Sequence, residues 1–157
     1  MATHRILGIS IGTTKIGIAV LQRNEIYEWK MKGFDESWSP DKLEAIIAYI
    51  DDYTLVHPLK SIGVKIPALH SHTSAITQII QRIEHLAKIK GIILQTYTLS
   101  DIKLHWNGQQ KATRDQLTQT ILGKHPKFQS HYNRMKRTKT VHFEKLFEAI
   151  AVAHMVR

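Results

Sequence analysis

The sequence predicts one α/β domain in which a mixed five-stranded sheet carries helices on both faces. Three strand-like segments come first, over residues 5–11, 14–22 and 25–33, and short apolar strands then alternate with helical patterns. Strands joined by tight turns pair antiparallel, whereas strands joined through helices pair parallel. The order β-β-β-α-β-α-β-α-α therefore gives a mixed sheet, and we expect residues 1–157 to form it as a single domain.

The first three strands are predicted from how apolar residues are spaced. Residues 5–11 are mostly apolar, which is typical of a buried strand. Residues 14–22 form a second strand, in which the alternate positions Ile16, Ile18 and Val20 share one face. Residues 25–33 alternate charged and apolar side chains, which predicts an antiparallel strand with one face in water. The pair Arg23-Asn24 supplies the turn between the second and third strands.

Helix start and stop signals divide the middle of the chain. Ser39 is suited to the N-cap of a helix and Pro40 to its first turn, and apolar residues then recur at helical spacing. A second helix opens at Ser71 or Thr73 and carries a long stripe of isoleucines. Gly91 is placed to end that helix.

The remaining elements complete the predicted order. Short apolar strands cover residues 62–66 and 92–97, and a polar segment follows over residues 100–108. Helical patterns cover residues 113–122 and 143–156. This succession is similar to that of the ribonuclease H-like architecture, in which a mixed sheet is covered by helices on both faces.

The charge of the chain favours a polyanionic partner. It contains 22 Lys and Arg residues against 13 Asp and Glu residues, a formal net charge of +9. No acidic residue occurs between Gln116 and Phe143, a stretch in which Phe128 and Tyr132 stand among basic residues and which predicts a nucleic-acid surface. A solvated loop without a partner is the alternative. The cations of this stretch are Lys124, Lys127, Arg134, Lys136, Arg137 and Lys139.

Several other classes of protein are disfavoured by composition. The chain has no cysteine, which leaves no disulfide framework and no thiolate metal site. No stretch reaches the roughly 18 continuous apolar residues of a membrane span, and the N-terminus leads into a strand without the pattern of a secretory leader. We therefore expect a cytoplasmic protein with no membrane partner.

Two family resemblances follow from the opening hairpin. The run from Gly8 to Thr14 resembles the first phosphate motif of sugar kinases, but those proteins have two lobes and this chain is too short for both. The run from Gly12 to Val20 resembles the hairpin of the YqgF family and of RuvC Holliday-junction resolvases. Downstream, the segments 97–117 and 148–154 resemble the RuvC pattern after its fifth strand and in its closing helix.

The RuvC resemblance implies two-metal cleavage of phosphodiesters, in which carboxylates hold two Mg²⁺ ions. The matching positions of this chain have lost most of those carboxylates. The first-strand acid falls on Ser10 and the fourth-strand acid on Lys65. The closing-helix positions fall on Lys145 and Glu148, with Glu144 replacing Lys145 if the register shifts by one. We therefore expect no metal site and no cofactor, and we assign no catalytic residue.

Lys65 and Glu148 should lie close together if this fold is right. Such a pair either holds a phosphate, with Lys65 standing in for a metal ion, or is simply a salt bridge that closes an inactive cleft. The resemblance also places Lys103, Lys111 and Arg114 at the border of a DNA cleft, although Lys111 and Arg114 could equally be solvated charges at a helix start.

Three functional hypotheses remain open at this point. The first is a RuvC-like protein that binds nucleic acid, DNA and branched DNA in particular, without cleaving it, with a homodimer among the expectations. The second is an active, Mg²⁺-dependent endonuclease with an atypical site that uses Glu148, Glu144 and Ser10, with Asp101 or Asp115 as further candidates. The third is a scaffold or regulator that does not bind nucleic acid.

The ten histidines raise a separate question of metal binding. His70 and His72 form an i, i+2 pair, and His154 lies near Glu148 on the last predicted helix. Imidazole binds several transition metals. Scattered surface histidines are nevertheless the simpler interpretation in a chain with this many of them.

Overall fold

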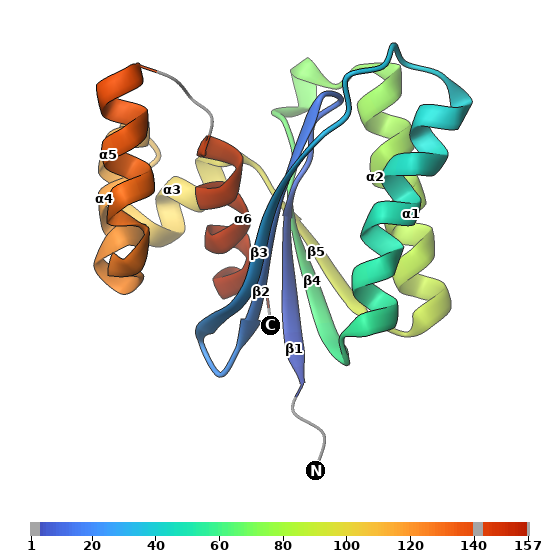
Figure 1. The fold of residues 1–157 in the computed structure, drawn as a ribbon, viewed down its shortest axis with the longest axis horizontal. Helices are drawn as coiled ribbons and strands as arrows, with labels where there is room; N and C mark the ends of the chain where they lie inside the picture. Colours follow the sequence, from blue (N-terminus) through green and yellow to red (C-terminus); the bar gives the residue numbers. More distant parts are fainter. Residues whose placement is uncertain (1–3, 140–142, 157) are drawn as a thin grey trace.

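The computed structural model describes residues 4–139 and 143–156 and contains one five-stranded sheet (Figure 1). The strand order is β3-β2-β1-β4-β5, in which β2 pairs antiparallel with β1 and β3, and β4 pairs parallel with β1 and β5. The predicted mixed sheet is therefore confirmed. Its strands are β1 (Arg5–Ser10), β2 (Lys15–Gln22), β3 (Glu25–Gly33), β4 (Leu59–Lys65) and β5 (Ile93–Tyr97).

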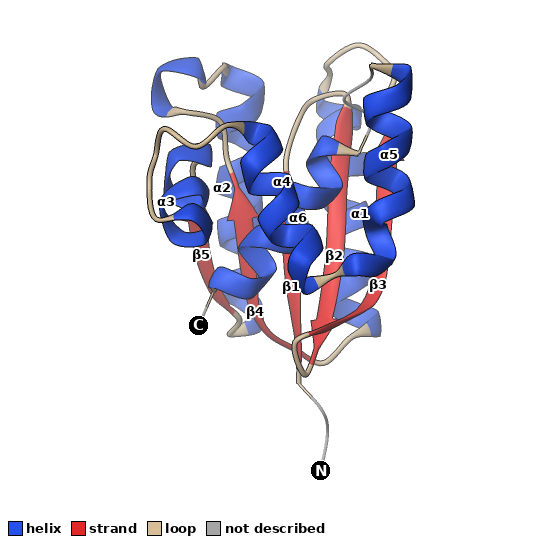
Figure 2. Cartoon of the chain, turned by 90° about the vertical axis from the view of Figure 1, so that its left-hand side faces the viewer, coloured by secondary structure: helices blue, strands red, loops and turns tan. Residues whose placement is uncertain are grey.

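Helices cover both faces of the sheet, as predicted (Figures 1 and 2). One face carries α1 (Pro40–Val56) and α2 (Ser74–Lys90), whose apolar stripes pack on the sheet in one buried cluster. The other face carries α6 (Glu144–Met155). Stacked outside α6 are α3 (Leu99–Asn107), α4 (Arg114–Lys124) and α5 (Gln129–Thr138). Two single-turn 3₁₀ helices, η1 (Leu69–Ser71) and η2 (Pro126–Phe128), complete the elements of the described residues.

The caps that the sequence indicates are present. The Ser39 hydroxyl accepts a hydrogen bond from the Lys42 N–H at the start of α1. Thr73, one of the two candidates, caps α2, and Gly91 ends it with a left-handed φ of 68° that costs glycine little.

Two helices occupy segments where the sequence pattern predicts none. The polar segment forms α3 because Thr98 and Asp101 make a reciprocal capping box at its start. The basic stretch forms α5, which buries Tyr132 against the outer helices and extends from the buried Phe128. Neither helix has a long apolar stripe that the sequence pattern would reveal. Packing against the rest of the protein therefore stabilises both helices.

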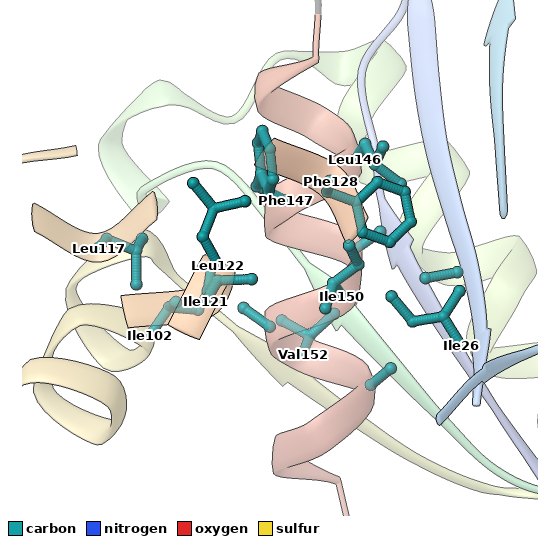
Figure 3. Close-up of a cluster of buried hydrophobic side chains, with 14 of the residues drawn as sticks. Ile26, Ile102, Leu117, Ile121, Leu122, Phe128, Leu146, Phe147, Ile150 and Val152 are labelled. Carbon is teal, nitrogen blue, oxygen red and sulfur yellow. The ribbon is translucent and has the colours of Figure 1, made fainter. Parts of the chain in front are cut away.

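A second buried cluster fills the space between the sheet, α6 and the outer helices (Figure 3). Ile102 of α3, together with Leu117 and Ile121 of α4, faces Phe147 and Val152 of α6. Because α6 is buried on almost every side, its residues connect the sheet to the outer layer.

Glycines let α6 lie directly on the sheet. A Cβ atom on Gly8 of β1 would overlap the carbonyl oxygen of Ala149, and one on Gly63 of β4 would overlap that of Val152. Gly8 and Gly63 are register partners on neighbouring strands, so they form a continuous floor under the helix. The backbone of α6 thus reaches the backbone of the sheet. Within the described residues, no helix has the length and apolar character needed to cross a membrane.

Candidate nucleic-acid site

Three predicted site residues meet at the carboxyl ends of β1 and β4. Ser10 and Lys65 are the last residues of these strands and are register partners in the parallel pair. Glu148 projects toward them from α6. The Ser10 hydroxyl donates to Glu148 Oε1 at 2.7 Å, and Lys65 Nζ lies 3.4 Å from Glu148 Oε2. The predicted proximity of Lys65 and Glu148 is therefore confirmed.

Arg114 adds a second cation to the same carboxylate. It is the first residue of α4, whose start is fixed by a capping box between Thr113 and Gln116. Its Nη1 lies 3.1 Å from Glu148 Oε2 and 2.8 Å from Glu144 Oε1. The arginine thereby joins α4 to the first two turns of α6.

Lys145 contributes a third cation from α6. Its Nζ donates to the carbonyl oxygen of Ile11 at 3.0 Å, which ties the helix to the turn after β1. Burial lowers the pKa of Lys145, an effect that Glu148 opposes and that Lys65 and Arg114 reinforce. Close cations thus share a limited number of counter-charges.

Glu148 remains anionic although it is only 4% exposed. Burial alone would raise its pKa, but the Lys65 ammonium, the Ser10 hydroxyl, Lys145 and Arg114 together hold that pKa below its ordinary value. The carboxylate is therefore the internal counter-ion of a basic cluster.

A pocket of about 260 Å³, called here the central pocket, is lined by Lys65, Arg114, Lys145 and Glu148 among others. Its walls carry four cations, Lys15, Lys65, Arg114 and Lys145, and only two carboxylates, Glu144 and Glu148. The excess of positive charge makes the central pocket suited to an anion.

Two further pockets share Arg114 with the central pocket. The α5 pocket, of about 290 Å³, lies between α4, α5 and α6 and is lined by Lys136 and Lys139 among others. The loop pocket, of about 560 Å³, lies between the segment after β4 and the start of α3, and also shares Lys65. Arg114 is therefore a common wall of all three.

The donor set does not match the pair of Mg²⁺ ions that the resemblance implies. Mg²⁺ binds mainly through carboxylate oxygens and water, and two such ions need several anionic ligands. Both carboxylates of the central pocket are already paired with Arg114, and Lys65 stands at a ligand position. Across residues 4–139 and 143–156, no group of three or more His, Cys, Asp or Glu side chains is arranged to hold a metal ion.

The predicted nucleic-acid residues divide into groups. Lys136 and Lys139 lie beside Arg114 around the α5 pocket. Lys124 and Lys127 lie toward the other end of the outer layer, where Lys124 is 5.9 Å from the Trp106 ring and Lys127 Nζ donates to Ile26 O at 3.2 Å. The remaining positions, on α3, before α4 and on α5, are Lys103, Lys111, Arg134 and Arg137.

Lys15 and Thr14 are site residues that sequence reasoning missed. They follow Gly12 in the opening hairpin, and that position beside the turn was the available signal. Two candidate acids of the nuclease hypothesis have other partners. Asp101 accepts from the Thr98 N–H, and Asp115 accepts from Tyr132 and from Lys136.

The histidines singled out from the sequence do not gather in the central pocket. His72 Nε2 lies 2.8 Å from the carbonyl oxygen of Pro67, and His70 is exposed in η1. His154 pairs with His125, their Nε2 atoms 2.7 Å apart, and packs edge-on against Trp106 with 5.6 Å between ring centroids. His154 therefore belongs to the packing between α4, α3 and α6.

This histidine pair predicts a loss of stability in mild acid. Burial, with smaller contributions from Lys124, His125 and His105, lowers the pKa of His154 to about 4. The unfolded chain takes up the proton near its ordinary value of roughly 6.5, so folding stability falls as the pH drops from there toward 4. We expect a loss of about 1–2 kcal/mol, reduced by solvent at these half-buried rings. Urea unfolding of the native chain and of His154→Phe across this range should show a clearly larger loss in the native chain, since burial also lowers the pKa of His125, which the variant keeps. Parallel pH profiles would contradict it.

No protein-family profile and no curated protein matches the sequence. Solved structures do match the fold. The Thermus thermophilus RuvC structure shares 13% identity over 95% of this chain and 90% of that chain, with a TM-score of 0.69. T. thermophilus RuvC in complex with a Holliday junction substrate shares 13% identity over 96% of this chain and 90% of that chain, with a TM-score of 0.72.

These likenesses show that the chain is an α/β protein with the mixed sheet of the ribonuclease H-like class. Within that class it has the RuvC-like fold over nearly its whole length. The resemblance seen in the sequence is therefore confirmed at the level of the fold.

Proposed function

We propose that this protein binds DNA through the central pocket and the adjoining basic surface without cleaving it. The observation that supports this most directly is the environment of Glu148. Its carboxylate accepts a hydrogen bond from Ser10 and pairs with Lys65 and Arg114. Two-metal cleavage instead needs several carboxylates that hold metal ions. A lysine supplies positive charge for a phosphate, but it does not generate a metal-bound hydroxide.

The distribution of charge supports a nucleic-acid ligand. The net charge of +9 favours polyanions, and the cations of the central and α5 pockets lie side by side through their common Arg114. A related fold, that of T. thermophilus RuvC, has been solved with a Holliday junction substrate. The central and α5 pockets of this chain present cations with which phosphates can pair.

Labelled DNA distinguishes this proposal from the other two hypotheses. A four-way junction and a matched duplex are incubated with the protein, with Mg²⁺ or Mn²⁺, across a salt series. Intact DNA and binding that weakens steeply with salt are expected. Metal-dependent cleavage, lost in a folded Glu148→Gln variant, would establish the nuclease hypothesis instead. Absence of binding at low salt would leave the scaffold or regulator hypothesis.

The preferred DNA shape and the number of protein copies stay predictions. The branched-DNA hypothesis requires the junction to bind more tightly than the duplex at the same salt concentration. The homodimer hypothesis requires a dimer in sedimentation velocity, with or without the junction. Each measurement can fail without affecting the basic proposal of phosphate binding.

A further inference from the structure

The C-terminal end of α1 presents apolar side chains to solvent. Leu55 and Val56 are 70% and 72% exposed there. Tyr27 of β3 is 55% exposed and reaches the same place, because its ring packs edge-on against His57, the C-cap of α1. Asp52 shares the helix face of Leu55 and Val56 through its i, i+3 and i+4 spacing. We call Tyr27, Asp52, Leu55 and Val56 the α1-end surface, and its exposed apolar side chains indicate a contact site.

A pocket of about 220 Å³, called here the α1 pocket, opens beside these side chains. It is lined by Glu28, Asp52, Tyr53, Val56 and His57. Asp51 pairs with Lys90, whereas no ion pair or hydrogen bond joins the Asp52 carboxylate to another described residue. Among the described residues, the α1 pocket therefore contains an acidic group without a counter-charge.

His57 orients the second carboxylate of the α1 pocket. An arginine side chain only donates, so Arg5 Nη1 donates to His57 Nδ1 at 2.7 Å. His57 then carries its proton on Nε2 and donates to Glu28 Oε2 at 2.8 Å. An imidazole in this tautomer is uncharged, so the bond fixes the Glu28 carboxylate without cancelling its charge.

The charge around the α1-end surface is opposite to that of the central pocket. Residues 25–52 contain eight Asp and Glu residues and three Lys residues, a net charge of −5 in a chain of +9. The helix α1 lies on the other face of the sheet from α6 and the outer helices (Figure 1). A polyanion is therefore disfavoured at this surface, and a basic partner is favoured.

The two regions also lie at opposite ends of β1. Arg5, the first residue of this strand, contacts His57 beside the α1 pocket, whereas Ser10, the last residue, contacts Glu148 in the central pocket. At the usual rise per residue, the ends of the strand lie about 17 Å apart. Ligands at the two regions can therefore be bound at the same time.

An arginine side chain matches the chemistry of the α1 pocket. Its guanidinium is planar, forms paired hydrogen bonds with carboxylates and stacks on aromatic rings. The protein already makes such a contact internally, because Arg5 Cζ lies 3.9 Å from the centre of the Tyr27 ring. The α1 pocket offers the ring of Tyr53 and two carboxylates to a second guanidinium.

We propose that the α1-end surface binds an extended basic segment of a partner protein. An arginine of that segment enters the α1 pocket and pairs with Glu28 and Asp52, while its apolar neighbours cover Leu55 and Val56. A small cation would occupy the pocket but leave the two apolar side chains in water, so the occupant is a peptide. This inference goes beyond the proposed function and does not require DNA binding.

Random heptapeptides displayed on phage test the kind of partner. The native chain is one bait, and a chain with both Glu28→Gln and Asp52→Asn is the counter-selecting bait. These substitutions keep the size of each side chain and remove its charge. We expect the peptides enriched by the native chain alone to share an arginine beside apolar residues. Absence of this shared pattern would overturn the proposal.

An enriched peptide then measures the role of charge by fluorescence anisotropy. Replacing its arginine by citrulline, which is nearly isosteric and uncharged, should weaken binding about tenfold, as loss of a charged hydrogen bond does. The chain with Glu28→Gln and Asp52→Asn should show a similar loss. A matched control removes two exposed acids elsewhere, through Glu36→Gln and Glu84→Gln, and should change affinity less than about threefold. Equal losses in both double variants would overturn the proposal.

A second pair of variants measures the apolar contact. Val56→Ser should weaken peptide binding about tenfold, the effect expected when an apolar side chain no longer leaves water on binding. Ile89→Ser is the control, because Ile89 is 68% exposed on α2 and lies outside the α1 pocket. Its peptide affinity should stay unchanged. An unchanged affinity in Val56→Ser would overturn the proposal.

Duplex DNA separates this inference from the proposed function. Both acid-removing double variants should bind duplex within about threefold of the native chain. Peptide binding without any DNA binding would retain this inference and remove the proposed function, and the reverse result would do the opposite. Sedimentation velocity tests the remaining occupant. Self-association that Glu28→Gln with Asp52→Asn abolishes would assign the surface to a second copy of the chain and overturn the proposal.

Discussion

Replacing Glu148 by glutamine is expected to destabilise the protein by about 3 kcal/mol, because breaking a buried ion pair leaves its partner charges uncompensated. Glutamine keeps the shape of the side chain and can still accept the Ser10 hydrogen bond. What it removes is the charge that Lys65 and Arg114 face. Urea or guanidinium unfolding at neutral pH measures the loss.

Two further variants identify the cause. Glu144→Gln removes another carboxylate of α6 that also pairs with Arg114, but its side chain is 28% exposed. It should cost less than about 1 kcal/mol, as exposed pairs do. Adding Lys65→Met to Glu148→Gln should recover part of the lost stability, since the buried ammonium is then gone. A double variant less stable than Glu148→Gln would contradict this account of the cluster.

Replacing Arg114 and Lys136 together by glutamine is expected to weaken DNA binding about 50-fold at 0.1 M salt, which corresponds to two lost phosphate contacts. Both cations line the α5 pocket, and Arg114 also lines the other two. The slope of log K against log salt should become shallower by about two. Fluorescence anisotropy with a labelled duplex across a salt series measures both quantities.

A charge-matched pair serves as the control. Lys60→Gln with Lys88→Gln also removes two positive charges, at exposed positions in β4 and at the C-terminal end of α2. This control should change affinity by less than about threefold, because it alters only the net charge. If both double variants weaken binding equally, the central and α5 pockets are not the DNA site.

The sheet could be predicted because its strands carry their own signals. Residues 5–33 contain two hairpins with clear turns, and β4 and β5 are short apolar runs between capped helices. The helices α3 and α5 could not be predicted from the sequence, since each buries few apolar side chains of its own. Their helical form depends on a capping box in one case and on the packing of Tyr132 in the other.

The same distinction applies to the candidate site. Ser10, Lys65 and Glu148 could be brought together from the sequence because parallel neighbouring strands end at one edge and the family resemblance places the last helix there. The double pairing of Arg114 and the separation of Lys124 from it depend on how α4 lies across the outer layer. A run of basic residues in the sequence predicts positive charge, but it does not show on which part of the folded protein each charged side chain lies.

The glycine floor beneath α6 has a mechanical consequence for the ligand. Gly8 and Gly63 bring the helix into main-chain contact with the strands, so α6 has no compressible side-chain layer on which to slide. Glu148 and Lys145 are therefore held at a fixed height above the strand ends. Under the proposed function, this cluster of charges is a preformed site, and we expect the DNA rather than the protein to change its shape on binding.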